Sequence, residues 1–450
     1  MKRAVVIAII IYIITWGIVF VVPLLFALGT DISFKAVLKN LIEALAYTSF
    51  LISIHVLFIV LCVLFLLIRY FKRLYYKKGI RIMGKRVLYS IVIPIFVIVC
   101  LYKIIVYTNG SEDFIYQWDH SIENTNEHSK NLYKNDGKHR GMSVFGWKPD
   151  NTKAITSLVK NNIEWVAVIP FISQKDNNTT KISMPDSIGQ WSKRDSTFIN
   201  TIQQLQNKGI HVQLKPHLWV IDGWRSEIDF SSDSDWKIWF ERYRKNMLHY
   251  AHMAEKSGAS LFCIGTELKS SLERQPGQWK ALVKEIKAIY SGKLTYAANW
   301  DGEYEIIDFW SDLDYIGIQA YFPLTQKVNP DLASIKKGWN THIKTLENLS
   351  RNHQRPILFT EVGYKSETSA TIKPWEWGSY FSILYQKKSD RTQQLAYQAL
   401  FESLWNKEWF AGTYIWEWDT RTTKESAPQS LNFSPRFKPA QNTIAKWYSK

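Results

Sequence analysis

The stretch LFCIGTELKS, residues 261–270, begins as a buried strand and reaches a glutamate at its end. Leu261 to Ile264 are apolar in succession, which is typical of a parallel strand covered on both faces. Glu267 then stands where such a strand should leave the core. A second stretch, PILFTEVGY at 356–364, has the same form and carries Glu361. Two apolar strands that each end in a carboxylate indicate both a fold and a chemistry.

The part of the chain after residue 140 alternates short apolar runs with amphipathic stretches. The runs begin at Gly141, Ile163, His211, Ser260, Leu294, Tyr315, Pro356 and Gly412. Helices are expected between them, for example at 195–208, 235–257, 278–289 and 392–405. Apolar strands that alternate with helices predict a parallel sheet. Eight such units in about 300 residues favour an α/β fold of the (β/α)₈ barrel type, and no glycine-rich phosphate loop points to a nucleotide-binding sheet instead.

The N-terminal quarter has the composition of a membrane segment. Each of three apolar stretches has the roughly 20 residues that cross a hydrocarbon core; they cover 4–28, 45–68 and 87–106. The first stretch is too long for a cleaved signal peptide and has no obvious small-residue cleavage site. We therefore expect a three-helix transmembrane segment at 1–107, a polar tether at 108–140 and a barrel domain at 141–450.

The charge distribution orients this segment. Residues 69–86 hold eight Lys or Arg and no acid. The positive-inside rule places this loop and the N-terminus in the cytoplasm, so the barrel should be periplasmic or extracellular.

Residues 1–110 carry 13 basic and two acidic side chains, whereas the remainder carries 43 basic and 38 acidic ones. The net charge of +16 is therefore mainly a membrane-flank effect, and nucleic acid is not an expected partner.

Glu267 and Glu361 end the fourth and seventh expected strands. Active sites of such barrels lie at the C-terminal ends of the strands, and these two strands face one another across the mouth. Carboxylates there could approach to about 5 Å, the spacing of a retaining glycosidase. Their proximity would also raise the pKa of one of them. Each glutamate alone could equally make a structural ion pair, but the two together favour catalysis.

Other strand ends carry side chains suited to a sugar. The expected substrate-binding residues are Trp147, His217, Trp219, Asn299, Trp300, Tyr321, Trp416 and Trp418, and Trp375 and Trp377 follow the seventh strand. Aromatic faces cover the apolar faces of sugar rings, although tryptophan also packs barrel rims. Tyr321 is expected to donate its hydroxyl to Glu361.

The remaining carboxylates near the strand ends are weaker candidates. Glu417 alternates with Trp416 and Trp418, so it is expected to point to the opposite side from them. Asp301 follows Trp300 and could cap the next helix. The sequence has no HExxH, no paired CxxC and no tight His cluster, so neither a metal nor another cofactor is expected.

Four short motifs together resemble glycoside hydrolase family 113. They are GMSVFGW from Gly141, KPHLW from Lys215, FCIGTEL from Phe262 and FTEVGY from Phe359. The resemblance spans about residues 140–450 and implies a β-mannan-degrading barrel of the retaining glycosidase clan. It also implies Glu267 as acid/base and Glu361 as nucleophile. Many clan members have Asn before the acid/base, where it contacts the sugar 2-hydroxyl, whereas this chain has Thr266; Asn299 could supply that contact instead.

Three functions remain open from the sequence. The first is a membrane-anchored retaining glycoside hydrolase that cleaves β-1,4-mannan or manno-oligosaccharides. The second is a glycan-binding or sensory barrel without turnover, against which the presence of both glutamates argues. The third is a component of envelope polysaccharide assembly, which three membrane spans would suit because an anchor needs fewer.

Overall fold

The structure, a computed structural model, describes residues 2–28, 33–45, 48–110, 116–183, 191–378 and 382–450. The chain forms two compact units, Met1–Lys103 and Ile104–Lys450. Residues 46–47 of the second expected span and 111–115 of the expected tether lie outside the described residues.

The first unit consists of helices. They are α1 (Lys2–Leu28), α2 (Phe34–Ala44), α3 (Thr48–Val87), a π-helical turn (Leu88–Val92) and the start of α4 (Ile93–Gly110). α1 packs on α3, with the Tyr12 ring 5.2 Å from that of Phe58 between centroids.

Among the described residues, two helical runs are long and apolar enough to cross a membrane: Val5–Leu28 and the 61-residue run Phe50–Gly110. The expectation of three separate spans is therefore not confirmed. The second and third expected spans belong to one run because the basic stretch 69–86 is itself helical; Lys and Arg are good helix formers. The run is interrupted at Gly79, whose φ of 76° leaves the helical region. An apolar helix as close to the N-terminus as α1 is also what a signal sequence would form.

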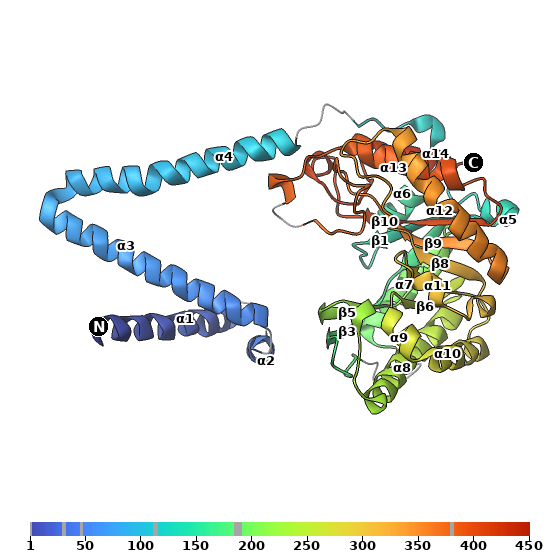
Figure 1. The fold of residues 1–450 in the computed structure, drawn as a ribbon, viewed down its shortest axis with the longest axis horizontal. Helices are drawn as coiled ribbons and strands as arrows, with labels where there is room; N and C mark the ends of the chain where they lie inside the picture. Colours follow the sequence, from blue (N-terminus) through green and yellow to red (C-terminus); the bar gives the residue numbers. More distant parts are fainter. Residues whose placement is uncertain (1, 29–32, 46–47, 111–115, 184–190, 379–381) are drawn as a thin grey trace. The chain divides into compact units, whose positions relative to one another are not determined.

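The second unit confirms the expected barrel. Eight parallel strands close in the order β1-β10-β9-β8-β7-β6-β4-β2, with helices around them (Figure 1). The strands are β1 (His139–Phe145), β2 (Trp165–Val168), β4 (His211–Leu214), β6 (Leu261–Thr266), β7 (Lys293–Asn299), β8 (Tyr315–Gln319), β9 (Ile357–Val362) and β10 (Phe410–Asp419). The helices are α5 (Tyr133–Asp136), α6 (Thr152–Lys160), α7 (Lys193–Gln206), α8 (Asp233–Ser257), α9 (Lys269–Arg274), α10 (Pro276–Ile289), α11 (Glu303–Ile306), α12 (Leu332–His353), α13 (Asp390–Leu404) and α14 (Pro439–Tyr448).

The strands are apolar on both faces because each face is covered. On β6, Phe262 and Ile264 belong to the larger hydrophobic cluster, which also contains residues of the surrounding helices. Leu261 belongs to a second cluster with residues such as Trp165, Tyr315 and Tyr414. This double burial explains why the strand sequences read as continuous apolar runs rather than as alternating ones.

The third expected strand is divided in two. β4 ends at Leu214, and the chain resumes as β5 (His217–Asp222), which leaves the barrel and pairs with β3 (Phe171–Asp176). Pro216 lies between them and lacks the N–H that would continue the ladder. Lys215, which follows β4, is fully buried. Trp219 lies on β5 outside the barrel sheet and is half exposed.

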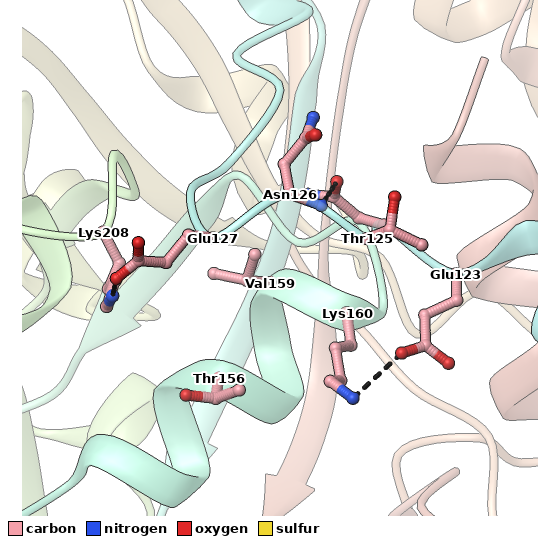
Figure 2. Close-up of a pocket in the computed structure, with 9 residues that line it drawn as sticks. Glu123, Thr125, Asn126, Glu127, Thr156, Val159, Lys160 and Lys208 are labelled. Atoms are coloured by element: carbon pink, nitrogen blue, oxygen red, sulfur yellow. Dashed lines mark hydrogen bonds and ion pairs between the residues drawn. The ribbon is translucent and has the colours of Figure 1, made fainter.

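Part of the expected tether lies against the barrel. At the N-terminal end of the barrel strands, the Glu164 carboxylate accepts hydrogen bonds from two backbone N–H groups of this segment. They are those of Leu132 and Tyr133, at 2.5 and 2.9 Å. Figure 2 shows the segment before α5 beside α6, around a small pocket of about 300 Å³. Two ion pairs hold it there, Lys160–Glu123 at 2.9 Å and Lys208–Glu127 at 2.6 Å.

Candidate active site

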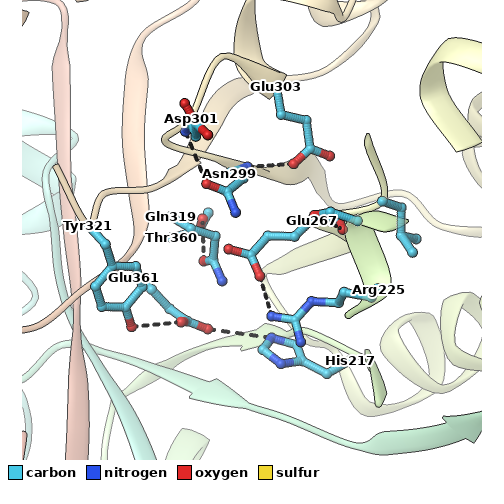
Figure 3. A network of polar contacts seen from close by, with 12 residues as sticks. His217, Arg225, Glu267, Asn299, Asp301, Glu303, Gln319, Tyr321, Thr360 and Glu361 are labelled. Carbon is cyan, nitrogen blue, oxygen red and sulfur yellow. Dashed lines mark hydrogen bonds and ion pairs between the residues drawn. The ribbon is translucent and has the colours of Figure 1, made fainter. Parts of the chain in front are cut away.

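The two glutamates of the fourth and seventh barrel strands line one cavity. Glu267 follows β6, Glu361 is the penultimate residue of β9, and the cavity has a volume of about 610 Å³. Figure 3 shows both carboxylates directed into the same space. The cavity is lined by Phe145, Phe171, His217, Trp219, Trp224, Arg225, Glu267, Asn299, Trp300, Asp301, Tyr321, Glu361, Trp375, Trp377, Trp416, Glu417 and Phe433.

Irregular strand pairing sets the direction of these side chains. The pairing register of β6 with β7 shifts between Cys263 and Thr266. Strand β9 has one extra residue relative to β8 between Phe359 and Glu361. Such bulges re-aim side chains near active sites. Glu267 has φ of 51°, in the left-handed region that residues other than glycine seldom adopt. Local backbone distortion, not regular strand alternation, therefore directs both carboxylates.

Glu361 is held by charge and hydrogen bonds. The Lys215 ammonium donates to Glu361 Oε1 at 2.7 Å, to Gln319 Oε1 at 2.8 Å and to the Thr360 carbonyl at 3.1 Å. The three donated bonds use all three ammonium protons. As expected from the sequence, Tyr321 donates its hydroxyl to Glu361 Oε2, at 3.0 Å.

His217 adds a neutral contact to Glu361. Its Nε2 lies 3.5 Å from Glu361 Oε1. Burial, together with the positive charges of Lys215 and Arg225, lowers the pKa of His217 well below its usual value. The imidazole is therefore uncharged at neutral pH, and Lys215 is the cationic partner of Glu361.

Glu267 has a different environment. Burial raises the pKa of this carboxyl and the nearby negative charge of Glu361 adds to the effect, while the guanidinium of Arg225, which contacts Glu267 Oε2, opposes it. The net effect is a raised pKa of Glu267. The Glu267 backbone carbonyl accepts a hydrogen bond of 2.9 Å from the Ser226 hydroxyl. The two carboxyls of the cavity are thus held differently, one ion-paired with lysine and one with a raised pKa.

Aromatic rings form the walls of the cavity. Trp300 stacks on Trp375 with 4.7 Å between ring centroids, and Trp416 packs edge-on against Phe145 and Trp377. Trp219 and Trp377 are 50% and 64% exposed. Flat apolar faces open to solvent are suited to sugar rings.

The structure brings eight of the ten predicted site residues to this cavity, namely Glu267, Glu361, His217, Trp219, Asn299, Trp300, Tyr321 and Trp416. Trp147 and Trp418 do not line it. Trp147 packs against the larger hydrophobic cluster, and Trp418 is 1% exposed within that cluster.

A bulge explains why Trp418 and Glu417 differ from expectation. Between Met142 and Val144 of β1, the partner strand β10 advances from Ile415 to Trp418 and so contains an extra residue. Strict alternation is lost, so Trp416 and Trp418 fall on different sides. Glu417, which was expected to face away from Trp416, lines the cavity beside it. Burial, reinforced by Asp419, raises the pKa of Glu417 to about 7.

Several residues in or beside the cavity were not predicted from the sequence. Lys215 had a signal, since a lysine inside the apolar run HVQLKPHLW is buried and must find a partner. Arg225 and Trp224 lie at a short 3₁₀ turn (Arg225–Glu227) after β5, where no pattern marks them. Across the described parts of the chain, no group of three or more His, Cys, Asp or Glu could hold a metal ion.

Comparison with known proteins identifies the family. The model of Glycoside Hydrolase Family 113 matches residues 144–436. The chain belongs to glycoside hydrolase family 113. It is therefore a glycoside hydrolase, and the cavity at the C-terminal strand ends lies where barrel enzymes have their active sites.

Solved structures of this family have the same barrel. The GH113 β-mannanase of Alicyclobacillus acidocaldarius, solved in complex with ManMIm, is 25% identical with a TM-score of 0.61, covering 70% of this chain and 97% of that one. Two structures of GH113 β-1,4-mannanase are 23% and 24% identical, with TM-scores of 0.60 and 0.59. They cover 69% and 68% of this chain, and 98% and 97% of their own. A search of curated proteins gave no match.

We expect Lys215 and Glu361 to be energetically coupled. Lys215→Met should lower the free energy of unfolding by about 3–5 kcal/mol, because it leaves a buried carboxylate without its cation. In the double variant with Glu361→Gln, the loss should be smaller than the sum of the single losses by at least about 1 kcal/mol. Urea denaturation of the full chain in detergent measures this. Additive losses would contradict the coupling. Lys160→Met, which removes a partly exposed ion pair with Glu123, should cost less than about 1 kcal/mol.

Proposed function

We propose that this chain is a retaining glycosidase that cleaves β-1,4-mannan or manno-oligosaccharides, with Glu361 as nucleophile and Glu267 as acid/base. The observation that carries the proposal is the contrast between two carboxyls in one cavity. Both are buried, but Glu361 contacts Lys215 and Tyr321, whereas Glu267 contacts Arg225 and has a raised pKa. The acid role requires a carboxyl whose pKa is raised, and the nucleophile role requires a carboxyl oxygen that is held in place for attack.

In the first step, a Glu361 oxygen attacks the anomeric carbon and the glycosidic bond breaks. Glu267 gives its proton to the leaving oxygen, so the products are a glycosyl ester on Glu361 and a free sugar hydroxyl. The hydrogen bonds from Lys215 and Tyr321 hold Glu361 in place for attack. The upward shift in the pKa of Glu267 favours its protonated form, which the acid role requires.

In the second step, Glu267 takes a proton from water, whose oxygen attacks the same anomeric carbon. The ester bond breaks and Glu361 leaves as carboxylate, so the anomeric configuration is retained. Arg225 beside Glu267 favours the ionised form that acts as base in this step.

The sugar-binding surface is assigned to the aromatic walls and polar groups of the cavity. Trp219, Trp300 and Trp416 are the proposed ring-stacking side chains. His217, Asn299 and Tyr321 are the proposed hydroxyl-binding groups, with Asn299 at the sugar 2-position because Thr266 is buried and does not line the cavity. The choice of mannan rests on the family and on its solved β-mannanases.

The proposal predicts hydrolysis of β-1,4-manno-oligosaccharides by the full-length protein in detergent. Glu361→Ala should lower kcat by more than about 10³-fold and Glu267→Gln by roughly 10²–10⁴-fold. Product analysis by proton NMR should show the β-anomer first. The exposed Glu273→Gln on α9 should match the wild type. Binding of glycan without turnover by all of these proteins would instead indicate a receptor, and activity on cello- or xylo-oligosaccharides alone would contradict mannan.

The Arg225–Glu267 contact predicts a change of pH profile. Arg225 lowers the pKa of Glu267, so Arg225→Met should raise it further. Glu267 would then keep its proton to higher pH, and the alkaline limb of kcat/KM should move upward by roughly 1 pH unit. Arg274→Met, which removes an exposed contact with Asp229, should leave this limb unchanged. A downward shift, or none, would contradict the acid role of Glu267.

We also propose that the N-terminal helices anchor the enzyme in a membrane. A run of 61 residues is about 90 Å long, some three times the hydrocarbon core. Its basic middle part, 69–86, suits the cytoplasmic surface, so the apolar parts before and after it would cross separately. With α1, this gives three crossings, a cytoplasmic N-terminus and a periplasmic or extracellular barrel.

Cysteine labelling tests this topology. In a chain with Cys62 and Cys100 replaced by serine, Lys78→Cys and Asn178→Cys would be treated with a membrane-impermeant maleimide on intact cells. We expect labelling of Asn178→Cys only, and of both after the cells are broken. Cys263 is buried and serves as internal background. Labelling of Lys78→Cys in intact cells would overturn the topology.

A further inference from the structure

A carboxyl group outside the cavity contacts the framework of the proposed acid/base. Glu303, the first residue of α11, is 0% exposed. Its Oε1 accepts a hydrogen bond of 2.6 Å from the Tyr296 hydroxyl, and its Oε2 accepts one of 2.7 Å from the Asn299 backbone N–H. Figure 3 shows Glu303 beside Asn299, joined by the second of these bonds. Glu303 does not line the cavity, so it has no direct part in the chemistry.

Tyr296 extends these contacts to the neighbour of Glu267. Its hydroxyl accepts a hydrogen bond of 2.7 Å from the backbone N–H of Leu268, and its ring is fully buried. The groups thus form a continuous chain from the Leu268 N–H through Tyr296 and Glu303 to the Asn299 N–H. It joins the end of β6 to the end of β7, and neither Tyr296 nor Glu303 lines the cavity.

We propose that Tyr296 and Glu303 are positioning residues that fix the backbone of Glu267 and Asn299 for proton transfer to the leaving oxygen. The proposal rests on the acid/base role assigned to Glu267 above. Neither residue is assigned a contact with the sugar.

The backbone of Glu267 gives the physical reason. Its φ of 51° costs on the order of 1–2 kcal/mol for a residue other than glycine, and persists only where surrounding contacts impose it. The Glu267 N–H donates to the Ala297 carbonyl at 3.0 Å, and the next N–H, that of Leu268, is held by Tyr296. The carbonyl of the same peptide accepts a hydrogen bond from Ser226. Loss of the Tyr296 contact would leave the peptide held at that carbonyl alone, so it could rotate and turn the carboxyl away from the glycosidic oxygen.

Glu303 acts through these hydrogen bonds more than through charge. Burial raises the pKa of Glu303 to about 8, so much of it is uncharged at neutral pH. A glutamine can reproduce both contacts, since its carbonyl accepts from Asn299 N–H and its amide group donates to the Tyr296 oxygen. Alanine can reproduce neither.

Leaving-group dependence distinguishes misplacement of an acid from general damage. Dinitrophenolate leaves a β-mannosyl substrate without being protonated. A sugar leaving group must be protonated by the acid as the glycosidic bond breaks. For the full-length protein in detergent, we expect Tyr296→Phe and Glu303→Ala to lower kcat/KM about tenfold on the sugar leaving group. On dinitrophenyl β-mannobioside, kcat/KM of Tyr296→Phe should stay within about twofold of wild type. Glu303→Ala also releases the Asn299 N–H, so it should lose some activity on this substrate, but less than on the sugar leaving group. Glu303→Gln should stay within about threefold on both.

The control is Tyr290→Phe, which removes another buried hydroxyl hydrogen bond, from Tyr290 to the Ala259 carbonyl at 2.6 Å. It should leave the ratio of the two kcat/KM values unchanged.

Equal losses on both substrates, or no loss, in Tyr296→Phe would overturn the positioning role. Glu267→Ala is the reference for the proposed function: if it shows no selective loss on the sugar leaving group, the acid/base assignment itself fails. Should Glu303→Ala not fold, Tyr296→Phe and Glu303→Gln decide the question.

Discussion

A closed barrel of eight parallel strands gives each strand an inward and an outward face, and strand bulges at the cavity break this alternation. The register shift after Cys263 precedes Glu267, and the extra residues on β9 and β10 fall at Glu361 and Glu417. Regular alternation would not direct these carboxyls into one cavity while their neighbours pack outside. The arrangement of the site therefore depends on backbone irregularities that the rest of the barrel must hold.

The carboxyl groups of Glu267 and Glu361 differ in the buried cations that they contact. Lys215 is 0% exposed and gives all its ammonium protons to acceptors inside the barrel, among them Glu361. Glu267 lies in the same cavity, yet burial and the charge of Glu361 outweigh Arg225 and raise its pKa. The division of roles that we propose follows from which cation each carboxyl meets and in what geometry. Behind Glu267, Tyr296 and Glu303 extend this ordering to the backbone.

Sequence patterns failed where a local rule was overridden by context. The stretch 69–86 was expected to be a loop because of its charge, but it is helical, since Lys and Arg also favour helix. The third expected strand was interrupted by Pro216, which in retrospect is visible in the sequence. Trp418 was expected in the site because it lies at the end of the last strand, but the bulge in β10 directs it into the core.

The sequence by itself determined the barrel, the glutamates at its fourth and seventh strand ends and the family to which the chain belongs. These features are carried by hydrophobic periodicity and by short motifs, which are local in the chain. Only the tertiary structure decided which side chains share the cavity, that Lys215 pairs with Glu361, and that Glu303 supports the segment after Glu267. Those relations join residues about 30 to 150 positions apart, with directions set by bulges and burial, and no local pattern encodes a distance between strands that are far apart in sequence.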